Sequence, residues 1–395
     1  MTLSLKLPSA SGKVEAYTLR GTTPVRPAPG VKFDRIAYSA AHVVADPLAA
    51  IDPWLQCAVD WDATIAYRQR LWSLGLGVAE AMDTAQRGMG LDWPTSLELI
   101  RRSLDAARDV PGALVASGCG TDHLILENVK TVDEVIAGYE EQMAAIEKLG
   151  GRLIVMASRA LARVARSPAD YERVYDRILS QAKQPVVLHW LGDMFDPALK
   201  GYWGNDDPDK AMDTALAVIA AHPDKVDGIK ISLLDKDKEI AMRRRLPPGV
   251  RMYTGDDFNY AELIAGDGFG AEKTHGQSDA LLGIFDAIAP AASAALGELA
   301  QGHLQTFHDI LGPTVPLSRH IFAAPTRFYK TGVVFMAWLN GHQSHFTMVG
   351  GQQSTRSLPH FAELFRLADA ANLLEQPELA VHRMGKLLAL HGVEA

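Results

Sequence analysis

From about residue 33 onward, short apolar runs alternate with longer segments whose apolar residues recur at helical spacing. The short runs are typical of buried strands and the longer segments of amphipathic helices. The runs that predict strands are 33–41, 77–84, 112–120, 152–158, 184–192, 226–233, 249–257 and 279–290, the last also long enough for a helix. The segments that predict helices are 63–77, 95–110, 131–151, 167–183, 207–222, 237–246 and 258–266.

Local signals mark the starts of three of these helices. Thr95 with Glu98, and Thr131 with Glu134, have the spacing of a capping box, in which each side chain bonds to a free backbone N–H at the helix start. Ser167 precedes a proline, which is well suited to the first position of a helix. We therefore expect helices to begin at these three places.

The repeated alternation predicts the fold class. Strands that alternate with helices form parallel sheets with helical crossovers, and eight such units in about 250 residues are the pattern of a (β/α)8 TIM barrel. A doubly wound open sheet is the alternative, but no G-x-G-x-x-G motif follows the first strand. After about residue 291 only helical patterns remain. We expect an N-terminal extension over 1–32, a barrel over 33–290 and a C-terminal all-helical appendage over 291–395.

Composition narrows the class of protein. The 395 residues carry a formal net charge of −8, which argues against nucleic-acid binding. No apolar stretch reaches the ~18 residues typical of a membrane span, and the N-terminus lacks the pattern of a signal peptide. The only cysteines are Cys57 and Cys119, which fits a reducing compartment. We expect a cytoplasmic protein that binds a small molecule and neither nucleic acid nor a membrane.

One lysine lies inside an apolar run. Lys230 is flanked by Ile229 and Ile231 in the sequence KVDGIKISLL. Burial lowers a lysine pKa from about 10.4 and exposes a neutral amine, which can attack a carbonyl group to form a Schiff base. An ion pair with an aspartate on the next strand would explain a buried lysine equally well.

Other polar residues lie where barrel strands end, which is where TIM barrels place their chemistry. His189 ends its strand and has a side chain that can shuttle protons near neutral pH, although a core histidine bonded to a backbone carbonyl fits as well. Arg159 fits a carboxylate clamp or a surface ion pair. We expect Arg159 to bind substrate together with Ser158, Asp257 and His275.

Two consecutive strands resemble a known enzyme family. The segment QPVVLHWLG followed by VDGIKISLLDKD is similar to the paired signature of the dihydrodipicolinate synthase / N-acetylneuraminate lyase family, whose strands read like PVILYN and GIKE. RMYTGDDFNYAELIAGDGFGA resembles its GDD strand, and FYKTGVVFMAWLNG resembles a helix of its C-terminal domain. The match covers roughly residues 33–375. The resemblance implies a Schiff-base-forming (β/α)8 lyase with a helical C-terminal domain.

The resemblance also implies roles for single residues. Lys230 takes the place of the Schiff-base lysine, and His189 that of a tyrosine that relays protons. Asp83 and Thr84 stand where two threonines hold the carboxylate of a keto acid. The implied activity is cleavage or formation of a carbon–carbon or carbon–oxygen bond in a small 2-oxo acid or 2-keto-3-deoxy sugar acid, by a class I aldolase-like enzyme. No metal or organic cofactor is required, and a homodimer or homotetramer is expected.

The sequence also departs from the family. Asp83 would repel a carboxylate, and the long loop at 193–208 brings Tyr202 and Trp203, which suit stacking on a sugar. One alternative is a metal-dependent barrel hydrolase or aldolase in which His189 and Asp257 join two further histidines, His42 and His275. Another alternative is a barrel that binds a metabolite without catalysis.

Overall fold

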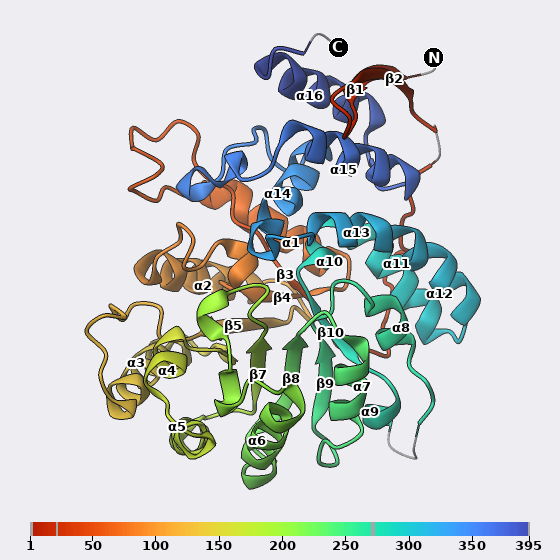
Figure 1. Ribbon diagram of the computed structural model, residues 1–395. Helices are drawn as coiled ribbons and strands as arrows, with labels where there is room; N and C mark the ends of the chain where they lie inside the picture. Colours follow the sequence, from red (N-terminus) through yellow and green to blue (C-terminus); the bar gives the residue numbers. More distant parts are fainter. Residues whose placement is uncertain (1–2, 21–22, 270–272, 394–395) are drawn as a thin grey trace.

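The computed structural model describes residues 3–20, 23–269 and 273–393, and its centre is a closed barrel of eight parallel strands (Figure 1). Around the barrel the order is β10-β3-β4-β5-β6-β7-β8-β9, and every neighbouring pair is parallel. This confirms the predicted TIM barrel. The strands are β3 (Ala37–Ala40), β4 (Gly77–Glu80), β5 (Val115–Cys119), β6 (Arg152–Met156), β7 (Val186–Leu191), β8 (Val226–Ser232), β9 (Arg251–Thr254) and β10 (Asp279–Leu282).

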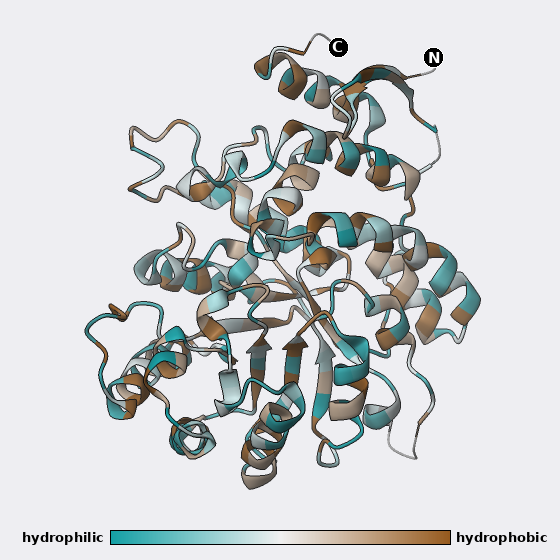
Figure 2. Ribbon diagram, in the orientation of Figure 1, coloured by the Kyte–Doolittle hydropathy of each residue, from teal (hydrophilic) through white to brown (hydrophobic). Residues whose placement is uncertain are grey.

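Helices join and cover the strands. They are α1 (Trp61–Ser73), α2 (Trp93–Ala107), α3 (Val132–Lys148), α4 (Arg159–Val164), α5 (Pro168–Gln181), α6 (Pro208–Ala221), α7 (Lys236–Arg243), α8 (Tyr260–Ala265) and α9 (Lys273–Gly276), with short 3-10 turns η1 (Asp83–Ala85), η2 (Pro197–Leu199) and η3 (Tyr202–Gly204). Figure 2 shows polar residues on their outer faces and apolar residues along the strands. Within the described ranges, no helix is both long and apolar enough to cross a bilayer.

The predicted helix starts are confirmed in two of three cases. Thr131 forms its capping box at the start of α3, and Ser167 forms one at the start of α5. The prediction for Thr95 is wrong, because α2 begins earlier and its cap is Asp92, whose side chain accepts the backbone N–H of Thr95. Glu98 is therefore free to pair with Arg101 on the same helix.

The barrel interior is packed at its amino-terminal end and polar at its carboxyl end. A compact interior cluster includes Tyr38, Ile154, Val187 and Tyr253. Side chains two residues apart on a strand point to the same face, so His189 follows Val187 into the interior. Along β7 the interior-facing side chain therefore changes from the apolar Val187 to the ionisable His189 two residues later.

The C-terminal helices lie over the carboxyl ends of the strands, since the arrows of β7, β8 and β9 in Figure 1 point toward the layer that contains α10 and α13. The segment predicted as the eighth strand holds both β10 and the short helix α10. The elements of this layer are α10 (Ile284–Ala287), α11 (Ala289–Ala300), α12 (Leu304–Leu311), η4 (Gly312–Thr314), α13 (Val315–Ile321), η5 (Thr326–Phe328), α14 (Tyr329–Leu339), η6 (Val349–Ser354), α15 (Leu358–Ala370) and α16 (Pro377–Leu390).

The N-terminal region contains an antiparallel hairpin of β1 (Ser4–Pro8) and β2 (Val14–Thr18). It packs on α15 and α16 at the far end of the chain. Tyr17 donates its hydroxyl hydrogen to Asp369 at 2.6 Å, and the backbone N–H of Arg20 bonds to the same oxygen at 3.0 Å. The two ends of the chain are therefore held together by a shared carboxylate.

Candidate active site

Lys230 is buried inside the barrel, with only 7% of its surface exposed. Its side chain passes over Gly255, where an added Cβ would lie 2.7 Å from Lys230 Cε. Burial lowers the pKa of the lysine, and the negative charges of Asp257 and Asp83 oppose this shift in part. In the described part of the chain no carboxylate forms a direct ion pair with Lys230, so the ion-pair interpretation is not supported. Burial therefore makes the neutral amine more accessible than it is in an exposed lysine.

His189 lies beside Lys230, because the two residues are register partners on β7 and β8. Its Nε2 atom is 3.4 Å from the Ser232 hydroxyl. Burial, together with the nearby charge of Lys230, holds the pKa of His189 well below its usual value. The expectation of a histidine that titrates near neutral pH is therefore corrected, and the imidazole is neutral in this site.

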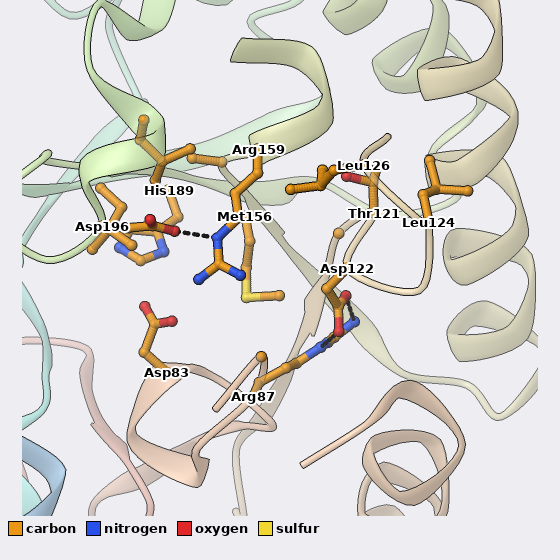
Figure 3. Close-up of a pocket in the computed structure, with 15 residues that line it drawn as sticks. Asp83, Arg87, Thr121, Asp122, Leu124, Leu126, Met156, Arg159, His189 and Asp196 are labelled. Atoms are coloured by element: carbon orange, nitrogen blue, oxygen red, sulfur yellow. Dashed lines mark hydrogen bonds and ion pairs between the residues drawn. The ribbon is translucent and has the colours of Figure 1, made fainter. Parts of the chain in front are cut away.

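Asp83 and Thr84 follow β4 in the turn η1, across the barrel from β8. Asp83 faces the pocket, as Figure 3 shows, and its charge acts on Lys230. The Thr84 hydroxyl is buried and lies 2.8 Å from the hydroxyl of Tyr329 on α14. The two neighbours therefore differ: Asp83 is open to a substrate, whereas Thr84 is bonded to the C-terminal helical layer.

A pocket of about 650 Å³, open solvent at its mouth included, lies at the carboxyl ends of β4 to β7 (Figure 3). Asp83 and His189 form part of its wall, and Lys230, which is not among the lining residues, is the register partner of His189. Its wall combines charged side chains with four leucines. The lining residues are Asp83, Arg87, Gly88, Gly120, Thr121, Asp122, Leu124, Leu126, Met156, Ala157, Arg159, His189, Leu191, Asp196 and Leu199.

Two arginines line this pocket in different ways. Arg87 is buried and forms an ion pair with Asp122 at 2.7 Å, and it also bonds to the carbonyl of Gly118. Arg159 bonds to Asp196 through Nε only, and within the described residues its two terminal nitrogens have no hydrogen-bond partner. Figure 3 shows the Arg159 guanidinium group lying between Asp196 and Asp83. Arg87 therefore stabilises the pocket wall, whereas the terminal N–H groups of Arg159 are available to donate hydrogen bonds to a ligand in the pocket.

Asp257 lies at the end of β9 close to Lys230. It is buried, and one of its oxygens accepts the backbone N–H of Ile284 at 2.9 Å. Burial raises the pKa of Asp257 to about 7, with the charge of Lys230 opposing the shift. Asp257 does not line the pocket, so its influence on the site is electrostatic.

Two of the predicted substrate-binding residues have other contacts. The Ser158 hydroxyl caps α4 by accepting the N–H of Leu161 and lies 2.6 Å from the hydroxyl of Thr121. His275 is on α9, which precedes β10, and its Nε2 lies 2.9 Å from the carbonyl of Leu246 before β9. His275 is thus at the amino ends of the strands, away from the pocket, and its predicted role is corrected.

The aromatic residues of the loop after β7 are also not available to a ligand. Trp203 is fully buried and Tyr202 is 2% exposed. The Tyr202 hydroxyl lies 2.9 Å from the hydroxyl of Tyr175 and accepts the N–H of Ser158 at 3.1 Å. These rings pack the loop onto the barrel, and the expectation that they stack on a sugar is wrong.

The sequence analysis missed two residues on α14. Lys330 is buried, and burial lowers its pKa to about 8, with the charge of Asp83 opposing the shift. Its Nζ donates to the carbonyl of Arg327 at 3.0 Å and lies 4.6 Å from the centre of the Tyr329 ring. The signal that singled out Lys230 is absent at Lys330, because Thr331 and Gly332 separate this lysine from the apolar run that follows.

The donors required by the metal-dependent alternative do not converge. His42 is bonded through Nδ1 to Asp286 at 2.7 Å, and His275 is at the other end of the barrel. In the part of the chain that the structure describes, no group of three or more His, Cys, Asp or Glu side chains could hold a metal ion.

Solved structures with a similar fold include dihydrodipicolinate synthases. The enzyme from Aquifex aeolicus has a TM-score of 0.62 at 11% identity, covering 87% of this chain and 99% of that one. The Thermotoga maritima enzyme has a TM-score of 0.61 at 15% identity, covering 87% and 100%. A prophage protein of the dihydrodipicolinic acid synthase family from E. coli K12, solved with pyruvate, has a TM-score of 0.63 at 15% identity, covering 87% and 100%. At these identities the likeness confirms the fold that the resemblance implied.

A search of curated proteins gave no match. A family model described as "Protein of unknown function (DUF993)" matches residues 5–393, nearly the whole chain. This protein, a TIM barrel with a dihydrodipicolinate synthase-like fold, therefore belongs to the DUF993 family.

Proposed function

We propose that this protein is a Schiff-base-forming lyase or aldolase that acts on a small 2-oxo acid or a 2-keto-3-deoxy sugar acid. The observation that carries the proposal is the buried amine of Lys230, which points along the barrel interior without a direct carboxylate partner among the described residues. A lysine whose pKa is lowered by burial loses its proton more easily, and the neutral amine is a nucleophile toward carbonyl carbons. Burial destabilises the charged form of a lysine and so shifts its pKa. Ionisable groups with shifted pKa values are concentrated at functional sites.

The chemistry needs no group beyond the chain itself. The Lys230 amine attacks the C2 carbonyl carbon, and loss of water gives an iminium ion. The iminium withdraws electrons from the neighbouring carbon, so a carbon–carbon bond or a C3–H bond next to it can break. In this proposal the neutral imidazole of His189, the register partner of Lys230, accepts a hydrogen bond from the substrate beside the amine.

The pocket wall supports an anionic, hydroxylated substrate. The free terminal nitrogens of Arg159 match the two oxygens of a carboxylate. Asp83, an acceptor, suits hydroxyl groups of a sugar acid rather than a second carboxylate. A pocket of about 650 Å³ has room for a chain of several carbons. The similar fold of a prophage protein solved with pyruvate is consistent with this substrate class.

Borohydride trapping tests the proposal. The protein is incubated with pyruvate or with other 2-oxo acids, reduced, and measured as intact mass. A mass increment equal to the reduced adduct is expected with at least one 2-oxo acid. Absence of any increment in folded protein would contradict the proposed Schiff-base function.

A further inference from the structure

Tyr329 reaches the centre of the barrel mouth from the C-terminal helical layer. Its hydroxyl lies 2.8 Å from the Thr84 hydroxyl after β4. An added Cβ on Gly283, after β10, would lie 3.1 Å from its ring, and the ring of Phe195, after β7, contacts it edge-on at 6.0 Å. These three contacts come from loops on different sides of the barrel. A ring that contacts all three loops lies across the mouth of the barrel, at the carboxyl ends of the strands.

The same two carboxylates act on Tyr329 and on Lys230. Asp83 and Asp257 both raise the pKa of Tyr329, after burial, which is the largest cause. Both also act on the Lys230 amine. The phenol therefore stays protonated at neutral pH, in contrast to His189, whose imidazole is neutral there. The raised pKa makes the Tyr329 phenol a weak acid and its phenolate a strong base, so a proton that the phenol gives up is readily taken back.

The ring is also held in one orientation. Phe322 stacks on Tyr329 with ring centres 4.3 Å apart, and the ammonium group of Lys330 lies over the ring at 4.6 Å. Aromatic packing fixes the Tyr329 side chain in the folded protein. Its hydroxyl therefore loses little further conformational entropy when the reaction takes place at the barrel mouth. A nearby cation also favours a transient negative charge on the phenol oxygen.

We propose that Tyr329 is a catalytic residue that donates and then accepts the proton in the Schiff-base reaction, an inference that rests on the proposed function. After Lys230 has added to C2, the carbinolamine hydroxyl takes the Tyr329 proton and leaves as water, giving the iminium ion and a phenolate. The phenolate then takes a proton from C3, which gives the enamine and restores the phenol. Protons and charges balance without any further reactant.

The variant Tyr329→Phe tests this assignment because it removes one oxygen and keeps the ring stacking. Two readouts are compared with wild type, using the 2-oxo acid that is trapped best on the wild-type enzyme. The first is the final yield of borohydride-trapped adduct. The second is the rate at which the C3 protons exchange with D2O, followed by NMR. A proton donor and acceptor in the transition state contributes about 100-fold or more, so we expect exchange to fall by at least about 100-fold.

The matched control is Tyr260→Phe. Tyr260 on α8 is also buried, and its hydroxyl lies 2.6 Å from that of Thr314 in η4, so it forms a second buried tyrosine–threonine pair, here between a barrel helix and the C-terminal layer. In this variant we expect the C3 protons of the substrate to exchange with D2O at the wild-type rate. If Tyr329→Phe does not fold, as judged by circular dichroism, Thr84→Val removes the hydrogen-bond partner of the phenol and is expected to slow exchange while leaving the final adduct yield unchanged.

The outcomes separate the two proposals. Full adduct yield with slow exchange in Tyr329→Phe supports the role of Tyr329. Full adduct yield with wild-type exchange overturns it while the Schiff-base function stands. A wild-type protein that traps no 2-oxo acid overturns the function, and the role of Tyr329 falls with it.

Discussion

Lys230 and His189 are register partners on adjacent parallel strands, and each is buried inside the barrel. Burial lowers the pKa of both side chains, and the charge of the lysine lowers that of the histidine further. Burial therefore opposes a positive charge on either side chain. Only the neutral amine reacts with a carbonyl group, so the groups that act on the lysine charge control the pH dependence.

Asp257 is the main such group, and Asp257→Asn removes it. The carboxylate stabilises the Lys230 ammonium and so raises the lysine pKa. Without it the neutral amine persists to lower pH, and the acid limb of the adduct-formation profile should move to lower pH. The profile is measured as trapped adduct against pH. Asp279→Asn, a buried aspartate at the start of β10, is the control and should leave the profile in place. Superimposable profiles for wild type and Asp257→Asn would refute this coupling.

Gly255 leaves the space that the Lys230 side chain occupies. In Gly255→Ala the new Cβ would lie 2.3 Å from Ser232 Oγ, 2.5 Å from the Ile231 carbonyl and 2.7 Å from Lys230 Cε. The lysine must shift, and a displacement of about 1 Å in a reacting group costs on the order of 100-fold in rate. Trapping kinetics should slow by about this factor. Gly312→Ala, where nothing lies within 4 Å of the new Cβ, serves as control, and equal rates in the two variants would contradict the argument.

Arg159 is expected to bind the substrate carboxylate. Because a hydrogen bond to a charged group contributes about 1.5–3 kcal/mol, Arg159→Met should weaken binding of the trapped 2-oxo acid by about 10- to 100-fold. A neutral ketone of similar size should be affected little. Arg173→Met removes an exposed ion pair with Asp133 and should change neither. Equal losses for the acid and the ketone would show that Arg159 does not contact the carboxylate.

Glu239 predicts a pH dependence of stability that is separate from catalysis. It is fully buried on α7, and burial raises its pKa to about 8. A carboxyl whose folded pKa is raised favours folding below its unfolded pKa of about 4.3, and this contribution is lost as pH rises toward 8. Glu239→Gln should melt at a higher temperature than wild type at pH 8 and at a similar one near pH 4. Calorimetry checks this, and melting curves that differ equally at both pH values would contradict it.

Most of the fold could be predicted from the sequence because buried parallel strands read as short apolar runs. The strand carrying Lys230 was found in this way, and so was β7 with His189. The errors were local. The start of α2 was placed at Thr95 because the capping-box pattern also occurs where Asp92 is the better-placed cap. The eighth strand was drawn too long because β10 runs directly into the apolar helix α10.

The site was predictable only in part because its residues come from distant elements. Strand ends pointed to Arg159 and His189, and the family resemblance pointed to Asp83; all three line the pocket. The same rule selected His275, since an assignment to a loop does not fix at which end of the barrel a side chain lies. Tyr329 and Lys330 were missed because nothing in the local pattern of α14 indicates that the helix packs over the barrel mouth.

The most direct test of the account is to locate the trapped adduct by peptide mapping. The chain offers its own control, because Lys330 is a second buried lysine whose pKa burial also lowers. We expect the reduced 2-oxo acid on the peptide that contains Lys230, its loss in Lys230→Met, and its retention in Lys330→Met. An adduct on Lys330, or one that survives in Lys230→Met, would contradict the central role of Lys230.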